Sequence, residues 1–437
     1  MMSREKVVTI AIASDVHLMA PSLLIQEGEA FQRALEADRK LLCESETLVD
    51  KLIEELQAHA PDLLLIPGDL TKDGERLSHE LFAEKLQELR ESGIQTLVVP
   101  GNHDIYNPHA RVYDGDNHAP TDQVSPETFA EIYKDYGYGG PHLIERGPRL
   151  SYVAEPIEDL WVLAIDSCRY ETNNEDRYPY TGGEVTLETI LWVEKIAERA
   201  KKKGKRLLAM MHHGILEHFP VQTLLAREYL VKDWIKVASR LANAGVRVVF
   251  TGHFHAQDVA ALRFPKGLLY DVETGSIVTY PSPYRIVHYY PDRLEIESHH
   301  IALQSEITNG LTLQEYGYQH LEEGLPHMIA FIIGYIQKYY PGKISDEVAA
   351  NILEMVPHFT SLLMDIYSGH LEGDEVGLAY NHNPDEESDT PYSGDQFNEL
   401  RQFVSSIMPQ YAPIFTLIEG ALHSTILPDN DLTISLT

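Results

Sequence analysis

Five short apolar runs in the sequence lack polar alternation, and each is followed at once by Asp, Asn or His. The runs read VVTIAIAS, LLLIPG, TLVVPG, RLLAMM and VRVVFTG. Such runs are typical of strands buried on both faces, and α/β sheets place their chemistry beyond the carboxyl ends of these strands. We therefore expect the side chains after the runs to meet at one site. They are Asp15 and His17, Asp69, Asn102 with His103 and Asp104, His212 with His213, and His253 with His255.

Helical patterns separate the runs, so the first part of the chain reads as a layered α/β domain. We expect helices from about residue 29 to 59, 78 to 92 and 187 to 203, and a long excursion over the strand ends at 105–150. Short β-segments follow from Leu268 to Ile301. This pattern predicts a domain of residues 1–303.

The remainder, residues 304–437, has apolar residues at helical spacing and predicts an all-α C-terminal domain. Its faces could pack on the first domain or on a second copy, as a homo-oligomer. Between its helices, residues 372–395 are rich in acids without the spacing of a calcium-binding loop, which favours a solvated loop. The expected helices are Glu322–Tyr340, Ser345–Tyr367, Gln396–Ile407 and Tyr411–Leu422.

The composition limits the partners. A formal net charge of −32 disfavours partners held through phosphate backbones or anionic lipids, so stable nucleic-acid binding is not expected. The two cysteines, Cys43 and Cys168, do not form a disulfide framework. No apolar stretch approaches the roughly 18 residues of a membrane span. Without a signal-peptide pattern, we expect a cytoplasmic protein, or an exported one whose signal segment was removed.

Each polar cluster is weak evidence for chemistry on its own. Asp15 and His17 point the same way in an extended backbone, but any polar pair at a strand end could look alike. Asp69 after a glycine could be an ordinary turn residue. The joint pattern carries the inference, because all clusters follow strands of one domain and offer enough oxygen and nitrogen atoms for two metal ions.

The blocks D-x-H, G-D, G-N-H-D, H and G-H-x-H occur in the order that is typical of the calcineurin-like metallophosphoesterase superfamily. The resemblance covers about Val8 to Ile301. It implies a four-layer αββα fold with two packed mixed sheets. It also implies two divalent or mixed-valence metal ions and a hydroxide shared by both metals that attacks phosphorus.

Ligand roles follow from the same resemblance. Asp69 would bridge the two metals, and His103 would stabilise the phosphoryl group or protonate the leaving oxygen. Asp104 would orient His103 or be structural, and His213 would lie behind the ligands or face the substrate. One metal would be held by Asp15, His17 and His255, and the other by Asn102, His212 and His253.

At two places the sequence differs from patterns of this superfamily, and these differences limit the choice of subfamily. Lys72 stands where purple acid phosphatases have a ferric-iron Tyr, which leaves Mn, Fe(II) or Zn. Gly214 and Ile215 replace prolines after His212 and His213. The segment GDLTKDGE, the insertion from Ile105 and the helical tail are most similar to bacterial cyclic-nucleotide phosphodiesterase-like members.

The expected function is metal-dependent hydrolysis of a small soluble phosphate ester, most simply a phosphodiester such as a cyclic nucleotide. A nuclease of the same superfamily is an alternative that would need a basic groove. A catalytically silent binding or scaffold protein is a second alternative, although every ligand position is intact. Arg111 could clamp a phosphate, but a surface role is the simpler reading.

Overall fold

The computed structural model describes residues 7–436 except 37, 174–177, 220–221, 305–306, 340–341, 343, 373–401 and 403–429. The expected helices at 396–407 and 411–422 and the acidic segment 372–395 fall almost wholly outside these residues. Within the described part, no helix is long and apolar enough to cross a membrane.

The first sheet is mixed and has the strand order β18-β15-β14-β1-β3-β4. Its strands β1, β3 and β4 run parallel, and β14, β15 and β18 add in antiparallel fashion. The parallel part therefore directs three strand ends to the same edge. The bounds are β1 (Val8–Ile12), β3 (Leu63–Ile66), β4 (Gln95–Val98), β14 (Pro283–Tyr289), β15 (Arg293–His300) and β18 (Leu432–Ser435).

The second sheet is also mixed, in the order β12-β13-β11-β10-β9-β8-β7. Its central strands β9, β10, β11 and β13 are parallel. The run at 143–146 forms its edge strand, so the expectation that residues 105–150 stay outside the sheets is wrong at that point. The bounds are β7 (Leu143–Arg146), β8 (Tyr152–Ile157), β9 (Leu160–Ile165), β10 (Arg206–Met211), β11 (Val248–Thr251), β12 (Asp258–Phe264) and β13 (Gly267–Glu273).

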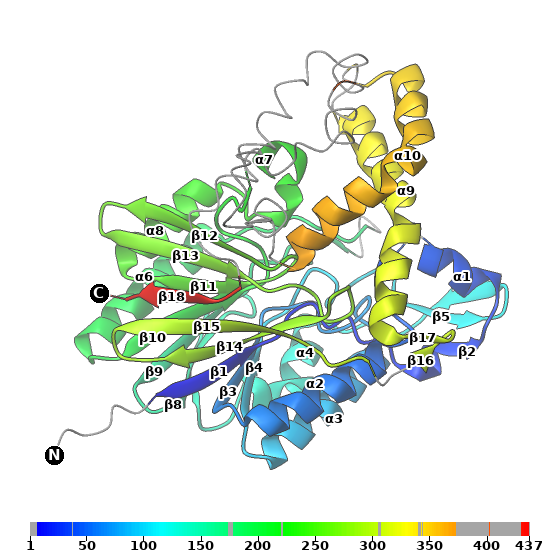
Figure 1. Cartoon of the computed structure of the whole chain (residues 1–437). Coiled ribbons are helices and arrows are strands. Elements are labelled where there is room, and N and C mark those ends of the chain that lie inside the picture. Colours follow the sequence, from blue (N-terminus) through cyan, green and yellow to red (C-terminus); the bar gives the residue numbers. More distant parts are fainter. Residues whose placement is uncertain are drawn as a thin grey trace, which may run out of the picture.

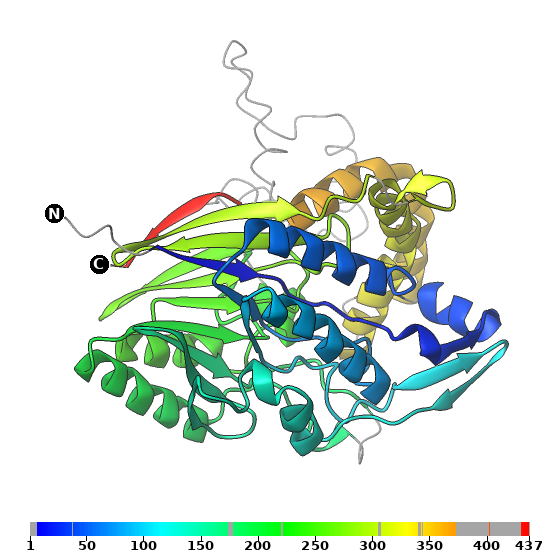
Figure 2. The ribbon, with the colours of Figure 1, turned by 90° about the horizontal axis from the view of Figure 1, so that it is seen from below.

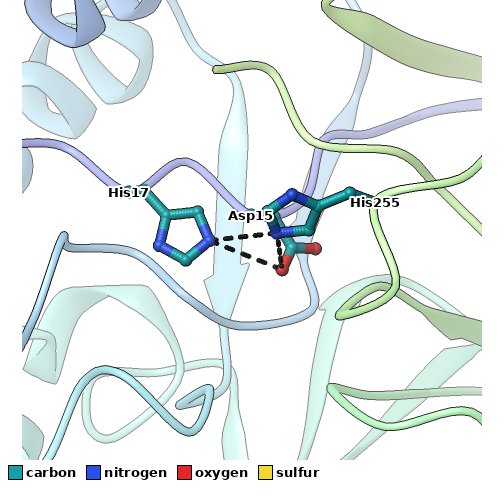
Figure 3. Close-up of side chains that lie close together, drawn as sticks. All are labelled: Asp15, His17 and His255. Atoms are coloured by element: carbon teal, nitrogen blue, oxygen red, sulfur yellow. Dashed lines mark hydrogen bonds and ion pairs between the residues drawn. The ribbon is translucent and has the colours of Figure 1, made fainter. Parts of the chain in front are cut away.

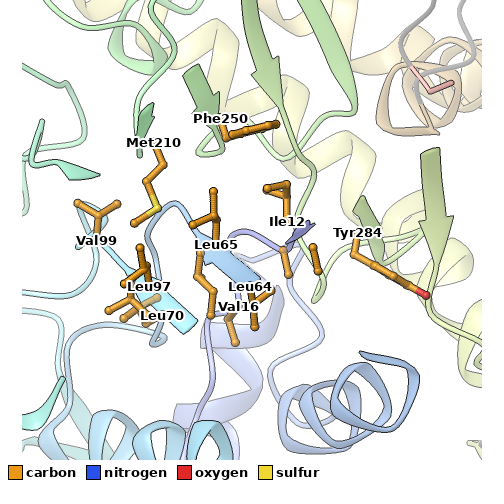
Figure 4. Packing of buried hydrophobic residues seen from close by; sticks show 14 of the residues in the cluster. Ile12, Val16, Leu64, Leu65, Leu70, Leu97, Val99, Met210, Phe250 and Tyr284 are labelled. Carbon is orange, nitrogen blue, oxygen red and sulfur yellow. The ribbon is translucent and has the colours of Figure 1, made fainter. Parts of the chain in front are cut away.

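The two sheets pack face to face around one apolar core. Ile12 and Leu65 of the first sheet lie opposite Met210 and Phe250 of the second, and all four side chains are buried (Figure 4). Because these strands are buried on both faces, their sequences are continuous apolar runs without polar alternation. The expectation of packed mixed sheets is confirmed.

Helices cover the outer faces of the sheets (Figures 1 and 2). Helix α2 (Ser45–His59) buries the stripe that includes Leu48, Leu52 and Leu56, and it packs beside α3 (Arg76–Glu91). On the second sheet, α6 (Leu187–Lys202) and α8 (Trp234–Ala244) share an apolar cluster with the strands. Their stripes repeat at helical spacing, which is why the sequence predicted them.

The helix expected at about 29–59 is two helices. Helix α1 (Glu29–Glu36) ends before a turn, and α2 begins at Ser45. In that turn Leu41 and Leu42 are buried, and the Leu41 amide donates to the carbonyl of Val278 at 2.7 Å. A contact with a distant segment therefore overrides the local helical preference.

A small sheet lies beside α1 (Figure 2). It comprises β2 (Leu24–Gln26), β5 (Arg111–Asp114) and β6 (Asn117–Pro120), and a short 3-10 helix (Pro21–Leu23) precedes β2. Helix α4 (Pro126–Ile132) follows, capped by the Ser125 hydroxyl, which accepts from the Thr128 amide. The insertion after His103 thus has its own ordered structure at one end of the molecule.

The described residues after 303 form both helices and strands. Helices α9 (Leu313–Tyr339) and α10 (Asp346–Glu372) pack on each other, as expected from 322–340 and 345–367. The all-α expectation is wrong at two places. Strands β16 (Ile307–Thr308) and β17 (Leu311–Thr312) form a hairpin, and β18 pairs with β15 in the first sheet. This pairing is remote in sequence, so helical periodicity could not reveal it.

A buried charged cluster lies at one end of the second sheet. His218, after β10, is fully buried among three acids of β12 and β13. Its Nδ1 lies 3.2 Å from Asp258 Oδ1, and its Nε2 lies 3.2 Å from Asp271 Oδ2 and 3.4 Å from Glu273 Oε2. These carboxylates raise the pKa of His218 well above its usual value although burial opposes the charge, so the ring is an imidazolium near neutral pH.

Candidate metal centre

The polar clusters that follow the five apolar runs meet where the two sheets place their parallel strand ends. The loops after β1, β3 and β4 come from the first sheet, and those after β10 and β11 come from the second. The side chains gather in groups, buried except at His103, whose potential ligand atoms lie within 4.8 Å of one another. The groups are Asp15, His17 and His255; His17, Asp69 and His103; and Asp69, His212 and His253.

In the first group, Asp15 and His17 face His255 (Figure 3). The Nε2 atoms of the two histidines are 3.2 Å apart, and Oδ1 of Asp15 lies 3.3 Å from Nε2 of His255. The same oxygen lies 3.9 Å from Nε2 of His17. Three donor atoms thus converge on one point, as a cation requires.

In the second group, His212 faces Asn102 and Asp69. Its Nε2 lies 2.9 Å from the amide oxygen Oδ1 of Asn102 and 3.3 Å from Oδ2 of Asp69. The ring of His253 lies 4.6 Å from that of His212, centroid to centroid. Nitrogen and hard oxygen atoms are combined here as in the first group.

Asp69 stands between the groups. Its Oδ2 is 3.3 Å from His212 and 3.6 Å from Nε2 of His17, while its Oδ1 accepts the His103 amide at 2.9 Å. One carboxylate oxygen therefore faces a histidine of each group. The buried His/Asp clusters are consistent with a dinuclear metal site.

Several atoms are positioned in a way that fits bound cations. Nδ1 of His212 donates to the Pro67 carbonyl at 3.0 Å, which fixes the ring with its Nε2 facing the centre. Nδ1 of His255 lies 3.2 Å from Thr279 Oγ1. Oδ1 of Asp15 is buried without a hydrogen-bond partner among the described residues, and a buried carboxylate oxygen in that state needs a positive partner.

The backbone is strained at these positions. The angle φ is positive at Asp15 (52°), His17 (42°), Asp69 (49°), His253 (78°) and His255 (67°). Non-glycine residues in this region cost about 1 to 3 kcal/mol each and cluster at functional sites. Neighbouring packing must hold these turns, since the strain would otherwise relax.

Glycines allow the loops to come this close. A Cβ at Gly101 would lie 2.0 Å from Oδ1 of Asp69, and one at Gly252 would lie 2.3 Å from Oδ2 of Asp15. Both distances are far below van der Waals contact. Crowding as well as turn geometry thus explains the glycines that precede Asn102 and His253.

The pKa values of the buried histidines diverge. Burial opposes a charge on His212, but the Asp69 carboxylate outweighs it and raises the pKa of His212 to about 9. Burial and the neighbouring His212 lower the pKa of His213 to about 3. Both nitrogens of the His213 ring are engaged, by Ser167 Oγ at 2.8 Å and by the Thr181 carbonyl at 2.7 Å. His213 is therefore a neutral support and faces neither ligand group through a free nitrogen.

His103 stands beside the groups with its side chain 27% exposed. Its Nδ1 donates to the Lys72 carbonyl at 2.7 Å and lies 3.0 Å from Oδ1 of Asp73. Burial and Lys40 lower the pKa of His103, and the carboxylates of Asp69 and Asp73 outweigh them, so the net shift is upward. The ring is held at Nδ1 and presents its Nε2 edge for proton transfer.

The carboxylate of Asp104 is hydrogen-bonded to backbone and side-chain donors of two loops. Its Oδ2 accepts the amides of Gly101 (2.8 Å) and Leu70 (3.1 Å), and its Oδ1 accepts the amide and hydroxyl of Thr71, both at 3.0 Å. With all four contacts made to the loops after β3 and β4, Asp104 ties those loops together. Of the two roles expected for Asp104, these contacts favour the structural one, and Asp73 is the carboxylate beside the His103 ring.

Asp73 belongs to a buried network that the sequence reading missed. Lys72, 4% exposed, contacts Asp73, lies 3.7 Å from Glu75 Oε1 and sits over the Tyr113 ring at 5.6 Å. Burial opposes its charge, but the two acids raise the pKa of Lys72, and Lys72 in turn lowers that of Asp73. The segment GDLTKDGE contained a signal for this network, because a basic and an acidic residue, Lys72 and Asp73, follow Asp69 there.

Arg111 does not reach the centre. Its Nη1 donates to the carbonyls of Pro108 (2.6 Å) and Ala110 (2.9 Å) in its own loop. The structure therefore favours a surface role for Arg111 over a phosphate clamp.

Two packed mixed sheets with buried His, Asp and Asn side chains at their strand ends are the arrangement of a metal-dependent phosphoesterase. The sequence profile of the calcineurin-like phosphoesterases matches residues 8–257. The chain belongs to the calcineurin-like phosphoesterase family.

Curated relatives are more distant. A probable glycerophosphodiester phosphodiesterase, GpdQ, of Arcobacter nitrofigilis is 27% identical over 201 residues, 45% of this chain and 57% of that protein. A probable cyclic nucleotide phosphodiesterase of Synechococcus is 25% identical over 203 residues, 46% of this chain and 60% of that protein. The chain thus spans less than two thirds of the length of either relative. A dimetal phosphatase from Danio rerio aligns with a TM-score of 0.46 at 14% identity, over 68% of this chain and 96% of that one.

Proposed function

We propose that this protein hydrolyses small soluble phosphodiesters, such as cyclic nucleotides, with two divalent metal ions. The observation that carries the proposal is Asp69, whose Oδ2 faces His17 on one side and His212 on the other. A carboxylate placed between two donor groups offsets the repulsion of two cations a few ångströms apart.

The proposed ligand roles follow the two groups. Asp15, His17 and His255 would hold one ion, and Asn102, His212 and His253 the other, with Asp69 shared. Bound cations supply Lewis acidity, lowering the pKa of a water nucleophile and polarising the phosphoryl group. Mn, Fe(II) and Zn all suit this mixture of imidazole and carboxylate ligands.

His103 is the proposed catalytic residue. Fixed at Nδ1 by the Lys72 carbonyl and Asp73, it keeps Nε2 turned to the site. Protonated, that nitrogen can donate to the oxygen of the leaving group as the bond to phosphorus breaks. The upward pKa shift of His103 favours the protonated form that this role needs.

Other observations support the diester preference. Two of the curated relatives are named as probable phosphodiesterases, and an acidic chain suits a compact ester better than a nucleic-acid duplex. We also propose that residues 1–303 carry the chemistry and that residues 304–437 form an attached unit, except for β18 in the first sheet.

Metal analysis combined with a substrate panel tests the proposal. The full chain is loaded with Mn²⁺, and its metal content is measured. It is then assayed on bis(4-nitrophenyl) phosphate, 4-nitrophenyl phosphate, and 2′,3′- and 3′,5′-cyclic AMP. We expect two ions per chain and a higher kcat/KM for diesters than for the monoester. A chain with two bound ions and no diester hydrolysis contradicts the proposal.

A further inference from the structure

A cavity of about 1250 Å³ lies beside the metal centre and takes no part in the roles assigned above. Its lining comes from three parts of the chain. These are the loop around Tyr180, the segment that runs from the 3-10 helix Arg227–Tyr229 into the first turns of α8, and one side of α9 at Gly334 and Lys338. A volume of this size accommodates a nucleotide-sized ligand.

The cavity and the metal centre share walls. The carbonyl of Glu228 lies 3.3 Å from Nε2 of His253, and the ring of Tyr229 lies 4.7 Å from the His253 ring. On the other side, the Thr181 carbonyl accepts from His213. Thr181, Glu228 and Tyr229 all line the cavity. Its wall therefore contacts both His253, a proposed metal ligand, and His213, which supports the centre.

Positive charge gathers in this cavity although the chain carries a net charge of −32. Two of the basic groups are neutralised, since Arg240 pairs with Glu194 and Lys232 with Glu184. In the described part of the chain, Arg169, Arg227 and Lys236 have no acidic partner. The basic lining residues are Arg169, Arg227, Lys232, Lys236, Arg240 and Lys338, against the acids Glu228 and Asp233. Unpaired cations in an acidic protein attract an anionic ligand.

Aromatic faces accompany these cations. The Arg169 guanidinium lies 4.8 Å above the Tyr180 ring, and Tyr178, 54% exposed, meets Tyr180 edge-on at 6.1 Å. Trp234, whose Nε1 donates to Thr223 Oγ1 at 3.0 Å, lines the same space. Flat rings beside unpaired cations suit a ligand that has both a planar base and phosphate groups.

We propose that this cavity binds a nucleotide that carries at least one phosphate group beyond the reacting one. The base stacks near Tyr180, and Arg227 and Lys236 hold the additional phosphate. This inference rests on the proposed phosphodiesterase function and names its substrate class as nucleoside diphosphate esters. In the reaction, water adds to the reacting phosphorus, the bond from that phosphorus to the leaving oxygen breaks, and this oxygen takes up a proton. No redox step occurs.

The assignment also gives the C-terminal region a part in substrate selection. Gly334 and Lys338 of α9 lie on the cavity wall, although no residue after 303 belongs to the proposed ligand set.

The test combines binding and turnover on the full-length, Mn²⁺-loaded protein. Isothermal titration calorimetry with ADP reports binding, and ADP-ribose, 3′,5′-cyclic AMP and bis(4-nitrophenyl) phosphate report turnover. The variant is Arg227→Gln/Lys236→Gln. Its matched control is Lys201→Gln/Lys266→Gln, which removes the same charge from exposed lysines outside the cavity. A second pair tests the aromatic wall of the cavity. The variant is Tyr180→Leu, and its control is Tyr290→Leu, because the Tyr290 ring also stacks with an arginine, Arg293, but does not line the cavity.

We expect the double variant to weaken ADP binding and raise KM for ADP-ribose by about tenfold or more, as loss of charge-assisted contacts predicts. Hydrolysis of bis(4-nitrophenyl) phosphate should not change, and neither control should alter ADP binding. Tyr180→Leu should lower the affinity for ADP more than the affinity for inorganic pyrophosphate, because pyrophosphate has no base to stack. If wild type hydrolyses bis(4-nitrophenyl) phosphate but ADP binding is equal in the double variant and its control, the inference is wrong while the proposed function stands. If no diester is hydrolysed, the proposed function itself fails.

Discussion

Nδ1 of His103 lies 3.0 Å from Oδ1 of Asp73, and the two side chains come from neighbouring loops after β4 and β3. The same Nδ1 donates to the Lys72 carbonyl at 2.7 Å. A ring held on one side in this way has a defined tautomer and orientation, and only Nε2 is available for chemistry.

Replacing His103 should affect the rate more than metal binding. His103→Ala should keep wild-type metal content and lower kcat by roughly 10² to 10⁴, the usual worth of a positioned acid or base. The loss should be smaller for 4-nitrophenyl esters, whose leaving group needs little protonation. Metal content by atomic absorption and kcat across leaving groups check this. Loss of metal would instead make His103 a ligand.

Asp73→Asn should reproduce part of that effect. Removing the carboxylate that orients His103 should lower kcat by about 10- to 100-fold, as for other groups that position a catalytic residue. In a double variant with His103→Ala the two effects should not add, because Asp73 acts through the ring. Asp114→Asn, at an exposed position of β5, is the matched control. Additive losses would show that Asp73 matters only for the stability of the Lys72 network.

Asp69→Ala should be the most damaging single ligand change. It removes the oxygen that faces both His17 and His212, so both groups lose charge compensation. We expect no measurable turnover and a fall of metal content at both sites. Asp135→Ala, an exposed acid, serves as the comparison. Two tightly bound ions with near-normal activity in Asp69→Ala would refute the dinuclear assignment.

Gly101→Ala tests the crowding of the loops. The added Cβ would meet Oδ1 of Asp69 at 2.0 Å, so the loop must shift away and separate the ligands. We expect weaker metal binding with a folded core, measured by metal titration and circular dichroism. Gly324→Ala on α9 has open space around the new methyl group and should leave metal binding unchanged. Equal metal affinity in both variants would show that the loop relaxes without disturbing the centre.

His218→Leu should destabilise the second sheet. It removes the imidazolium that lies between Asp258, Asp271 and Glu273, and breaking a buried pair costs about 3 to 5 kcal/mol. The folded pKa of His218 is raised well above 6.5, so its stabilisation is full below pH 6.5 and is lost as the pH rises through the folded pKa. Urea unfolding should therefore show a constant difference from wild type below pH 6.5 and a progressively smaller one as the pH rises above that value. The exposed His118→Leu is the control, and a difference that grows with pH would contradict the ion-pair account.

The strand ends were predictable because their signal is local. The apolar runs before Asp15, Asp69, Asn102, His212 and His253 are short and continuous, and burial on both faces accounts for them. The helical stripes of α2 and α6 were visible for the same reason.

What escaped prediction depends on contacts between distant residues. The orientation of His103 by Asp73 rather than by its neighbour Asp104 is decided by loop geometry. The break before α2 is decided by the contact of Leu41 with Val278. A homo-oligomer through the helical region stays a prediction.

The pairing of β18 with β15 has a consequence for synthesis. Residues 432–435 leave the ribosome long after residues 293–300, and until then the outer backbone groups of β15 are an open edge. The sheet that holds Asp15, Asp69 and Asn102 can therefore form early, but it acquires its final border only when translation has passed residue 435. A nascent chain should expose this edge to chaperones during that interval.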